Sequence, residues 1–432
     1  MKILDTGERA NLVTKFPAAS AMPRGFSFAS VHCGLKKRKL DLGLLVSENH
    51  ATAAAVFTTN RVQAAPVIVS REHIERASEH MRAIIVNSGN ANCSTGAKGL
   101  SGSRTTAIAI ALALGCMPEE VVVCSTGVIG LPLDVSKIVD AVPGLVNTRA
   151  LTSAGFEGFA HAILTTDIRP KWAAAKCIIG GKDVRLLGCS KGAGMIQPNM
   201  ATMLAFLVTD ASIPNTLLDS ALREVVSRTF NRITVDGDTS TNDAVVIFAN
   251  GASGSKPISG PGADWNRFCA ALESVCKKLA LAIVEDGEGA QRVVEIEVRG
   301  ASSNEAAEQM ARTIANSPLV KTAVAGADPN WGRILAAAGR SGVEFDPERA
   351  EIWMAGIKVY ERGTLCEFDE RAAHQKLLAK YIPIAVDLDP QRASGSKRKP
   401  RTSQGADRPG TARVWTCDFT AEYIRINSNY RS

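Results

Sequence analysis

The sharpest change from polar to apolar positions lies between Ser190 and Asp210, in the stretch SKGAGMIQPNMATMLAFLVTD. Its first half is rich in glycine and small polar residues, and its second half, Thr202 to Val208, is an apolar run. This contrast predicts a loop that leads into a buried strand. Thr202 stands at the junction. It either simply begins a core strand or presents its hydroxyl group as a nucleophile at the strand's mouth.

Other segments show the periodicities of helices and strands. Apolar residues three and four positions apart predict amphipathic helices over 214–231 and 264–283, and an alanine-rich helix over 103–114 is expected to end at Gly115. Short apolar runs bounded by turn residues predict strands over the ranges 54–58, 66–69, 83–86, 121–124 and 293–298, a hairpin over 351–360 that turns at Ala355-Gly356, and an edge strand over 414–427.

The length of the chain and its composition narrow the class of protein. A chain of 432 residues is too long for one simple core, and we expect two or three packed units. Apolar residues make up 45% and charged residues 22%, which is ordinary for a soluble globular protein. No apolar stretch is long enough to span a membrane, and the polar start MKILDTGERA does not resemble a signal peptide. A cytoplasmic protein with no membrane partner is therefore expected.

The positive net charge is concentrated in one segment. Residues 390–413 carry seven Lys or Arg and one Asp, so they supply six of the seven net positive charges and leave the remainder of the chain at +1. Because this segment also lacks large apolar residues, we expect a disordered basic insertion on the surface. Its KRKPR run could bind RNA, but a solvated insertion without a nucleic-acid partner is the preferred interpretation.

Cysteine and histidine spacing argues against a metal site or a disulfide framework. The ten cysteines contain no C-x-x-C pair and the six histidines no H-x-x-x-H pair, so we expect reduced thiols and no zinc. The aspartates of ITVDGDTSTNDAVVIF superficially resemble a calcium loop, but the closing glutamate of an EF-hand is missing.

Two further polar segments follow predicted strands. Ser125-Thr126-Gly127 comes after the strand 121–124, where a hydroxyl group and a bare backbone N–H suit an oxyanion hole, although such a tripeptide is also a common turn. The asparagines of NSGNANCSTG predict either a self-bonded turn or a support for the site. A threonine nucleophile needs a base, and cutting the chain in front of Thr202 would supply one, the freed α-amine.

The segments KGAGMIQPNMATML and STGVIG resemble those of the ornithine acetyltransferase family, the bifunctional glutamate N-acetyltransferases of arginine biosynthesis. The resemblance implies an α/β fold, a layered helix–sheet sandwich similar to N-terminal-nucleophile hydrolases. It also implies self-cleavage between Ala201 and Thr202 into an α chain, 1–201, and a β chain, 202–432. Two copies of each chain would form a heterotetramer.

The resemblance also assigns roles to particular residues. It implies that Thr202 is the nucleophile and that Thr126 and Gly127 form the oxyanion hole. The substrate-binding positions of the family match Thr165, Lys191, Thr202, Glu288, Asn427 and Ser432. The chain departs from the usual pattern at Ile168 and Ser432, where the family commonly has threonine.

The expected reaction is ping-pong transfer of an acetyl group from N2-acetylornithine to glutamate through an acetyl-threonine intermediate. No cofactor is expected, since the chain has no G-x-x-x-x-G-K-[ST] loop, and acetyl-CoA is left open as a co-substrate. Two alternatives remain: a self-processing aminopeptidase or amidohydrolase of related fold, and an RNA-binding protein that uses KRKPR.

Overall fold

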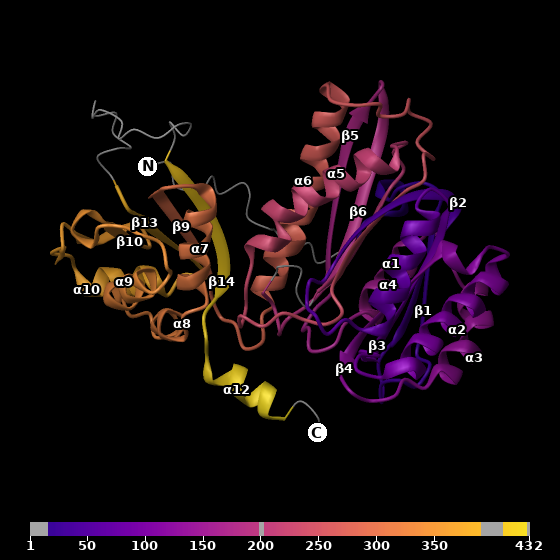
Figure 1. The fold of residues 1–432 in the computed structure, drawn as a ribbon, viewed down its shortest axis with the longest axis horizontal. Helices are drawn as coiled ribbons and strands as arrows, with labels where there is room; N and C mark the ends of the chain where they lie inside the picture. Colours follow the sequence, from indigo (N-terminus) through magenta and orange to yellow (C-terminus); the bar gives the residue numbers. More distant parts are fainter. Residues whose placement is uncertain (1–15, 198–202, 390–408, 430–432) are drawn as a thin grey trace. The chain divides into compact units, whose positions relative to one another are not determined.

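The computed structural model describes residues 16–197, 203–389 and 409–429 (Figure 1). These residues form two compact units, in agreement with the expected two or three. Unit 1 comprises 1–231 and 238–283, and unit 2 comprises 232–237 and 284–432. The expected cleavage point, Ala201–Thr202, lies outside the described residues. Since the sequence on both sides of it belongs to unit 1, the expected α and β chains would not coincide with the two units.

Unit 1 is built on an eight-stranded mixed sheet. Its strand order is β4-β3-β2-β8-β7-β6-β5, and β1 also pairs with β2. The strands are β1 (Phe26–Val31), β2 (Leu42–Phe57), β3 (Met81–Asn90), β4 (Val121–Val128), β5 (Lys171–Ile179), β6 (Lys182–Lys191), β7 (Leu204–Thr209) and β8 (Ala244–Ala249). The pairs β3–β4 and β7–β8 are parallel, so equivalent ends of these strands lie side by side.

The long strand β2 joins two halves of this sheet. Its first part pairs with β1 and β3 and its last six residues, 52–57, pair with β8. Buried side chains of β3 and β4 share one core with those of β6, β7 and β8, and Phe159 of the helix Ser153–Ala162 contacts Phe206 of β7 in the same core, with ring centroids 5.6 Å apart. The two halves therefore pack against each other as a sandwich.

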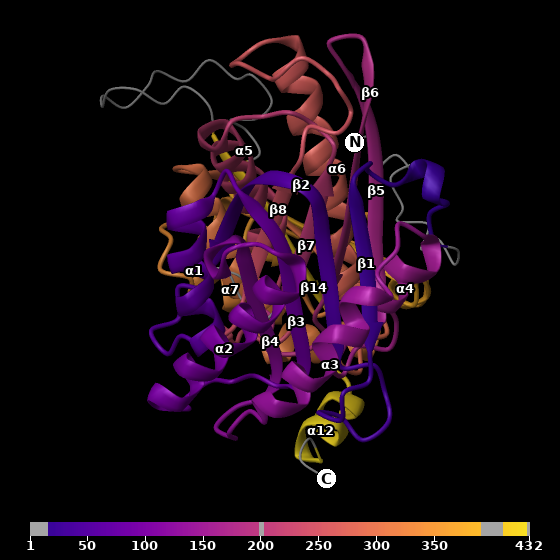
Figure 2. The same ribbon diagram turned by 90° about the vertical axis from the view of Figure 1, so that its right-hand side faces the viewer.

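Helices cover the outer surfaces of unit 1. They are α1 (Ala65–Ala77), α2 (Gly96–Leu114), α3 (Val135–Asn147), α4 (Ser153–Ala162), α5 (Asn215–Arg228) and α6 (Ala263–Glu285), the last of which runs on into unit 2. Figure 2 shows α2 and α3 on one face of β3 and β4, where their apolar residues pack with alternate residues of these strands. The layered helix–sheet class expected from the sequence is confirmed.

The segment 66–69, expected as a strand, is instead the first turn of α1. Pro66 stands at the start of the helix, where its missing N–H costs no hydrogen bond. Ser70 of α1 exchanges hydrogen bonds with the backbone of Val123, and His73 contacts the carbonyl oxygen of Val121 at 2.7 Å. The helix thus satisfies the free edge of β4, a role that the short apolar run does not reveal.

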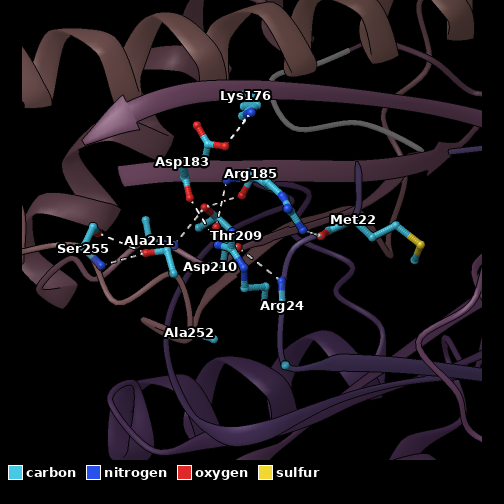
Figure 3. Close-up of polar contacts among 12 residues, drawn as sticks. Met22, Arg24, Lys176, Asp183, Arg185, Thr209, Asp210, Ala211, Ala252 and Ser255 are labelled. Carbon is cyan, nitrogen blue, oxygen red and sulfur yellow. Dashed lines mark hydrogen bonds and ion pairs between the residues drawn. The ribbon is translucent and has the colours of Figure 1, made fainter. Parts of the chain in front are cut away.

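A buried polar cluster fixes the far end of β7 (Figure 3). The fully buried carboxylate of Asp210 accepts hydrogen bonds from the Arg24 guanidinium at 2.9 Å and from the backbone N–H of Arg185 at 2.8 Å. Arg185 in turn donates to the carbonyl oxygen of Met22. The segment before β1 is thereby tied to the ends of β6 and β7.

Unit 2 has a six-stranded sheet of its own, in the order β12-β11-β10-β13-β9-β14. The strands are β9 (Val293–Ala301), β10 (Glu351–Met354), β11 (Ile357–Glu361), β12 (Thr364–Leu365), β13 (Tyr381–Asp387) and β14 (Gly410–Cys417). The helices are α7 (Asn304–Ala315), α8 (Pro318–Ala325), α9 (Trp331–Gly339), α10 (Glu370–Leu377) and α12 (Ala421–Ser428). Apolar residues of α7, α8 and α9 pack on β9, β10, β13 and β14 in one core.

The end of the chain corrects two expectations. The edge strand is β14, which begins at Gly410 and ends at Cys417, and residues 421–428 form a helix that Thr420 caps through a hydrogen bond from the N–H of Glu422. Residues 410–413 therefore belong to the sheet and not to the basic insertion, because they pair with β9. Residues 390–408 of the insertion lie outside the described residues.

Among the described residues, no helix is both long enough and apolar enough to cross a membrane.

Candidate active site

The two residues expected to form an oxyanion hole lie where the parallel strands β3 and β4 end. Gly127 has a φ of 136°, and a Cβ atom there would stand 2.3 Å from the carbonyl carbon of Gly89 in β3. Only glycine permits so close an approach of the two backbones. Thr126, next to it, is 5% exposed. The strand end is therefore tightly packed.

Hydrogen bonds of asparagine side chains hold this strand end in place. Ser125 donates to the side-chain oxygen of Asn87 at 2.6 Å, and Asn87 donates to the carbonyl oxygen of Asn90. Asn242 bridges two segments, because its amide group donates to the carbonyl oxygens of Ala91 at 2.6 Å and Ser125 at 2.8 Å. Within the loop the N–H of Asn92 donates to the side-chain oxygen of Asn90 at 2.7 Å, so the asparagine-rich segment is a self-bonded turn that also contacts Ser125 of β4, and its role as a support for the site stays a prediction.

Lys191, at the end of β6, points to this strand end. Its ammonium nitrogen lies 3.3 Å from the hydroxyl oxygen of Thr126 and 3.9 Å from a carboxylate oxygen of Asp167. Lys191 and Thr126 are thus brought together from strands that are far apart in the sequence. A cation beside the threonine hydroxyl gives this end of the sheet a positive potential that suits a developing oxyanion or a bound carboxylate.

Asp167 holds the loop that carries Thr165. Its fully buried carboxylate accepts hydrogen bonds from the backbone N–H groups of Thr165 at 3.0 Å and Gly192 at 2.7 Å, and from the ammonium of Lys171 at 2.6 Å. Burial alone would raise the pKa of Asp167, but the charges of Lys171 and Lys191 and the Gly192 N–H hold it well below its usual value. Ile168, the departure from the usual pattern, is 83% exposed and points away from this network.

Thr202 and Ala201 lie outside the described residues, and the described chain resumes at Met203. The backbone N–H of Met203 donates to a carboxylate oxygen of Asp243 at 2.8 Å. Asp243 is 1% exposed and stands directly before β8, the parallel neighbour of β7. Burial raises the pKa of Asp243 well above its ordinary value, although the Met203 N–H and the Lys191 charge oppose the shift.

A second group of expected substrate residues belongs to unit 2. The amide group of Asn427 in α12 donates to the carboxylate of Glu288 at 2.8 Å, and Glu288 is 7% exposed. The close approach of α12 depends on Gly289, because a Cβ atom there would lie 2.6 Å from the N atom of Tyr423. The Tyr423 hydroxyl donates to Asp236 at 3.1 Å. The structure therefore joins Glu288 and Asn427, while Ser432 lies outside the described residues.

Comparison with known proteins decides the family. The profile of the ArgJ family matches residues 27–432. The chain belongs to the ArgJ family. Two similar proteins are named arginine biosynthesis bifunctional protein ArgJ. The one from Thermotoga neapolitana is 44% identical over 415 residues, and the match covers 95% of this chain and 100% of the relative. The one from Thermus thermophilus is 45% identical over 413 residues, and the match covers 95% of this chain and 99% of the relative. A crystal structure of arginine biosynthesis bifunctional protein argJ from Bacillus halodurans is 40% identical, has a TM-score of 0.47, and covers 52% of this chain and 98% of its own.

The expected family is thereby confirmed, since the ArgJ family is the arginine-biosynthetic family that the motifs resemble. The roles of individual residues stay predictions. Among the described residues, no group of three or more His, Cys, Asp or Glu side chains is arranged to hold a metal ion. The expectation that this ArgJ-family chain needs neither metal nor cofactor also remains a prediction.

Sequence reasoning missed three polar residues of unit 1 that the structure places at the site. Asp167 stands beside Thr165, Asp243 belongs to the calcium-like loop, and Lys36, whose ammonium group donates to the carbonyl oxygen of Leu164, lies in a run of lysines and arginines. One feature of the sequence does point to Asp243, because a polar residue directly before a buried strand lies at the end of that strand. Lys36 and Asp167 gave no comparable signal in this ArgJ-family sequence.

Proposed function

We propose that the chain is a self-cleaving acetyltransferase that moves an acetyl group from N2-acetylornithine to glutamate in arginine biosynthesis. The observation that carries this proposal is the convergence of Lys191 and Thr126 at the mouth of the sheet, close to the strand that follows Thr202. Membership in the ArgJ family supports the same reaction. In the first step the Thr202 hydroxyl oxygen attacks the acetyl carbonyl carbon, and the Thr202 α-amine takes the hydroxyl proton.

The negative oxygen of the tetrahedral intermediate would be stabilised by Thr126 and by the backbone N–H of Gly127, with Lys191 adding a positive charge. The bond between the acetyl carbon and the ornithine nitrogen then breaks, and the α-ammonium of Thr202 returns its proton to that nitrogen. Ornithine leaves and the acetyl group remains on the threonine oxygen. The neutral amine of glutamate attacks the ester, gives up a proton, and leaves as N-acetylglutamate, which restores the Thr202 hydroxyl.

The carboxylate and the side-chain ammonium of the donor, acetylornithine, need protein groups of opposite charge. Lys191 suits the carboxylate of the amino-acid substrate and Thr165 lies on the loop that Asp167 holds beside it. Glu288, whose carboxylate Asn427 orients, suits the side-chain ammonium of ornithine. Ser432 would supply a further hydroxyl contact. No metal or cofactor takes part, and acetyl-CoA is a candidate second donor that an acetyl-transfer assay without ornithine tests.

We also propose that the processed enzyme is a cytoplasmic heterotetramer of two α and two β chains. Transfer rather than hydrolysis requires that the acetyl-threonine ester be protected from water until glutamate arrives. Size determination of the purified protein under native and denaturing conditions tests the assembly.

The decisive experiment combines intact mass, N-terminal sequencing and transfer of labelled acetyl groups. The wild-type protein should give two chains, one beginning at Thr202, and should move label from acetylornithine to glutamate. Thr202→Ala should stay one uncut, inactive chain, whereas Thr105→Ala, at an exposed position of α2, should be cut and active. Active protein with only its original N-terminus, or release of free acetate in place of N-acetylglutamate, would refute the proposal.

A further inference from the structure

The loop before β2 presents a lysine, Lys36, that the proposed reaction has not yet used. This loop folds around Asp41, whose fully buried carboxylate accepts the backbone N–H groups of Cys33 at 2.6 Å, Gly34 at 3.1 Å and Lys36 at 2.8 Å. Burial favours the neutral acid, but these N–H groups keep the pKa of Asp41 below its ordinary value. The backbone of Lys36 is therefore fixed by a built turn.

The ammonium group of Lys36 is fixed as well. It donates to the carbonyl oxygen of Leu40 at 3.0 Å and to that of Leu164 at 2.6 Å. Leu164 immediately precedes Thr165, so the ammonium lies against the loop that carries one of the proposed substrate residues. A lysine ammonium has three N–H donors, and these two carbonyl groups account for two of them.

The aliphatic part of the Lys36 side chain lies against the paired ends of β3 and β4, the strand end that holds Thr126 and Gly127. A Cβ atom on Gly89 would lie 3.0 Å from Cγ of Lys36, and Gly89 pairs with Gly127 in the β3–β4 register. Lys36 thus lies beside the strand end that holds Thr126 and Gly127 while its ammonium reaches the Thr165 loop. Three separate segments of unit 1 place it at the proposed site.

The charges around Lys36 leave room for an anion. The buried Asp167 carboxylate pairs with Lys171 at 2.6 Å and also lies 3.9 Å from the Lys191 ammonium, so one carboxylate faces two ammonium groups and Lys36 adds a third cation at this end of the sheet. Burial lowers the pKa of Lys36 to about 8, Asp41 opposes this shift, and the Lys191 charge adds to it. An ammonium with a pKa of about 8 is still mainly protonated at pH 7, and a bound carboxylate would relieve its repulsion with Lys191.

The proposed acceptor has a feature that the donor lacks. Glutamate carries two carboxylates, whereas acetylornithine carries one carboxylate and a side-chain cation, and a single lysine matches only one carboxylate. Resting on the proposed function, we propose that Lys36 binds the second carboxylate of the acceptor and so selects glutamate over neutral amino acids. Lys36 is then a specificity-determining residue of the second half-reaction.

The test compares two acceptors of equal length, glutamate and glutamine, with acetylornithine as donor. Wild-type protein should prefer glutamate, and Lys36→Met, which keeps the aliphatic stem, should lower the ratio of kcat/KM for glutamate to that for glutamine by roughly ten- to hundredfold, as expected for a lost charged hydrogen bond. The initial burst of ornithine, which reports use of the donor, should fall by a smaller factor than the acceptor ratio, because Lys191 and not Lys36 is assigned to the single carboxylate of acetylornithine.

Matched variants separate charge from structure. Lys37→Met removes an exposed lysine of the same loop and should keep the wild-type acceptor ratio. Lys36→Arg should retain part of the preference. If Lys36→Met does not fold, as judged by thermal unfolding, Lys36→Gln carries the same comparison, because its amide can still donate to the carbonyl groups.

Three outcomes would overturn the inference or its basis. An unchanged acceptor ratio in Lys36→Met or Lys36→Gln refutes the role of Lys36. An equal loss in the ornithine burst and in acceptor use also refutes it, because Lys36 would then act on both half-reactions. If the wild-type protein transfers acetyl groups to neither acceptor, the proposed function itself fails.

Discussion

The ammonium nitrogen of Lys191 lies 3.3 Å from the hydroxyl oxygen of Thr126, although the two residues are 65 positions apart in the chain. Lys191 ends β6 and Thr126 lies near the end of β4, so the sandwich of the two sheet halves is what unites them. The contact gives the threonine a cationic neighbour in a buried setting. This arrangement makes several variants informative.

Replacing Asp167 by Asn should destabilise unit 1. The change leaves the ammonium of Lys171 buried without its counter-charge, and breaking a buried ion pair in this way typically costs about 3–5 kcal/mol. Asp183→Asn breaks the exposed pair with Lys176 (Figure 3) and should have little effect on stability, because solvent screens an exposed ion pair. Urea unfolding of both variants measures the difference. Equal stability of the two variants would contradict this account of Asp167.

Gly127→Ala should disrupt the strand end and abolish both self-cleavage and transfer. The added Cβ would stand 2.3 Å from the Gly89 carbonyl carbon, which forces β3 and β4 apart. Gly130→Ala is a matched control, since Gly130 also has a positive φ, 83°, but has no atom within 4 Å of an added Cβ. It should show only backbone strain of about 1–3 kcal/mol. Thermal unfolding and a denaturing gel compare them, and similar behaviour would argue against steric closure at Gly127.

Relative to the parent protein, the Asp243→Asn variant should become more stable as the pH rises. Burial raises the pKa of Asp243 above 3.8, so the neutral acid contributes its full stability below pH 3.8 and loses it as the pH rises through the folded-state pKa. Asparagine does not titrate. The difference in Tm, variant minus parent, should therefore increase as the pH rises above about 3.8.

This measurement is best made in the Thr202→Ala background, where no new α-amine is formed. The charged neighbour of Asp243, Lys191, is present in both proteins. Asp264→Asn is the control: Asp264 is only partly buried, and the Arg267 hydrogen bond lowers its pKa, so no such increase is expected. A Tm difference for Asp243→Asn that is flat or falls with pH would show that its carboxylate is charged in the fold.

Glu288→Gln should lower kcat/KM for acetylornithine by roughly ten- to hundredfold, because a charged hydrogen bond to the ornithine side chain is worth about 1.5–3 kcal/mol. Asn427 still finds an oxygen acceptor in the variant, so α12 should keep its place. Glu422→Gln, on the same helix and paired with Arg425, should leave turnover near the wild-type value. Self-cleavage should survive in both. Uncut Glu288→Gln would assign Glu288 to processing, and unchanged turnover would remove it from the pocket.

Deleting 392–408 should leave transfer kinetics within about twofold of wild type, as for most surface changes. The deletion must stop before Gly410 because this residue begins β14, which pairs with β9 along its whole length. Deleting 392–413 removes the start of that strand and should destabilise unit 2. Steady-state kinetics and thermal unfolding distinguish the two deletions. A large loss of activity in the shorter one would mean that the insertion takes part in function.

The sequence by itself determined the features that depend on neighbours within one or two turns. The helix ending at Gly115 is present because the glycine adopts the left-handed conformation that a helix end requires, with a φ of 68°. The hairpin at Ala355-Gly356 lies where expected, between β10 and β11. The long, unusual motif around Thr202 was sufficient to identify the family without any structure.

Only the tertiary structure decided how segments distant in sequence meet. Residues 66–69 became a helix because the free edge of β4 needed hydrogen-bonding partners that Ser70 supplies. Lys36, Asp167 and Asp243 acquire their importance from burial and from partners tens or hundreds of residues away. Hydrophobic periodicity shows which face of an element is buried but not which other element that face packs against. The charges at the proposed site were therefore assigned by strand pairing and packing, not by local pattern.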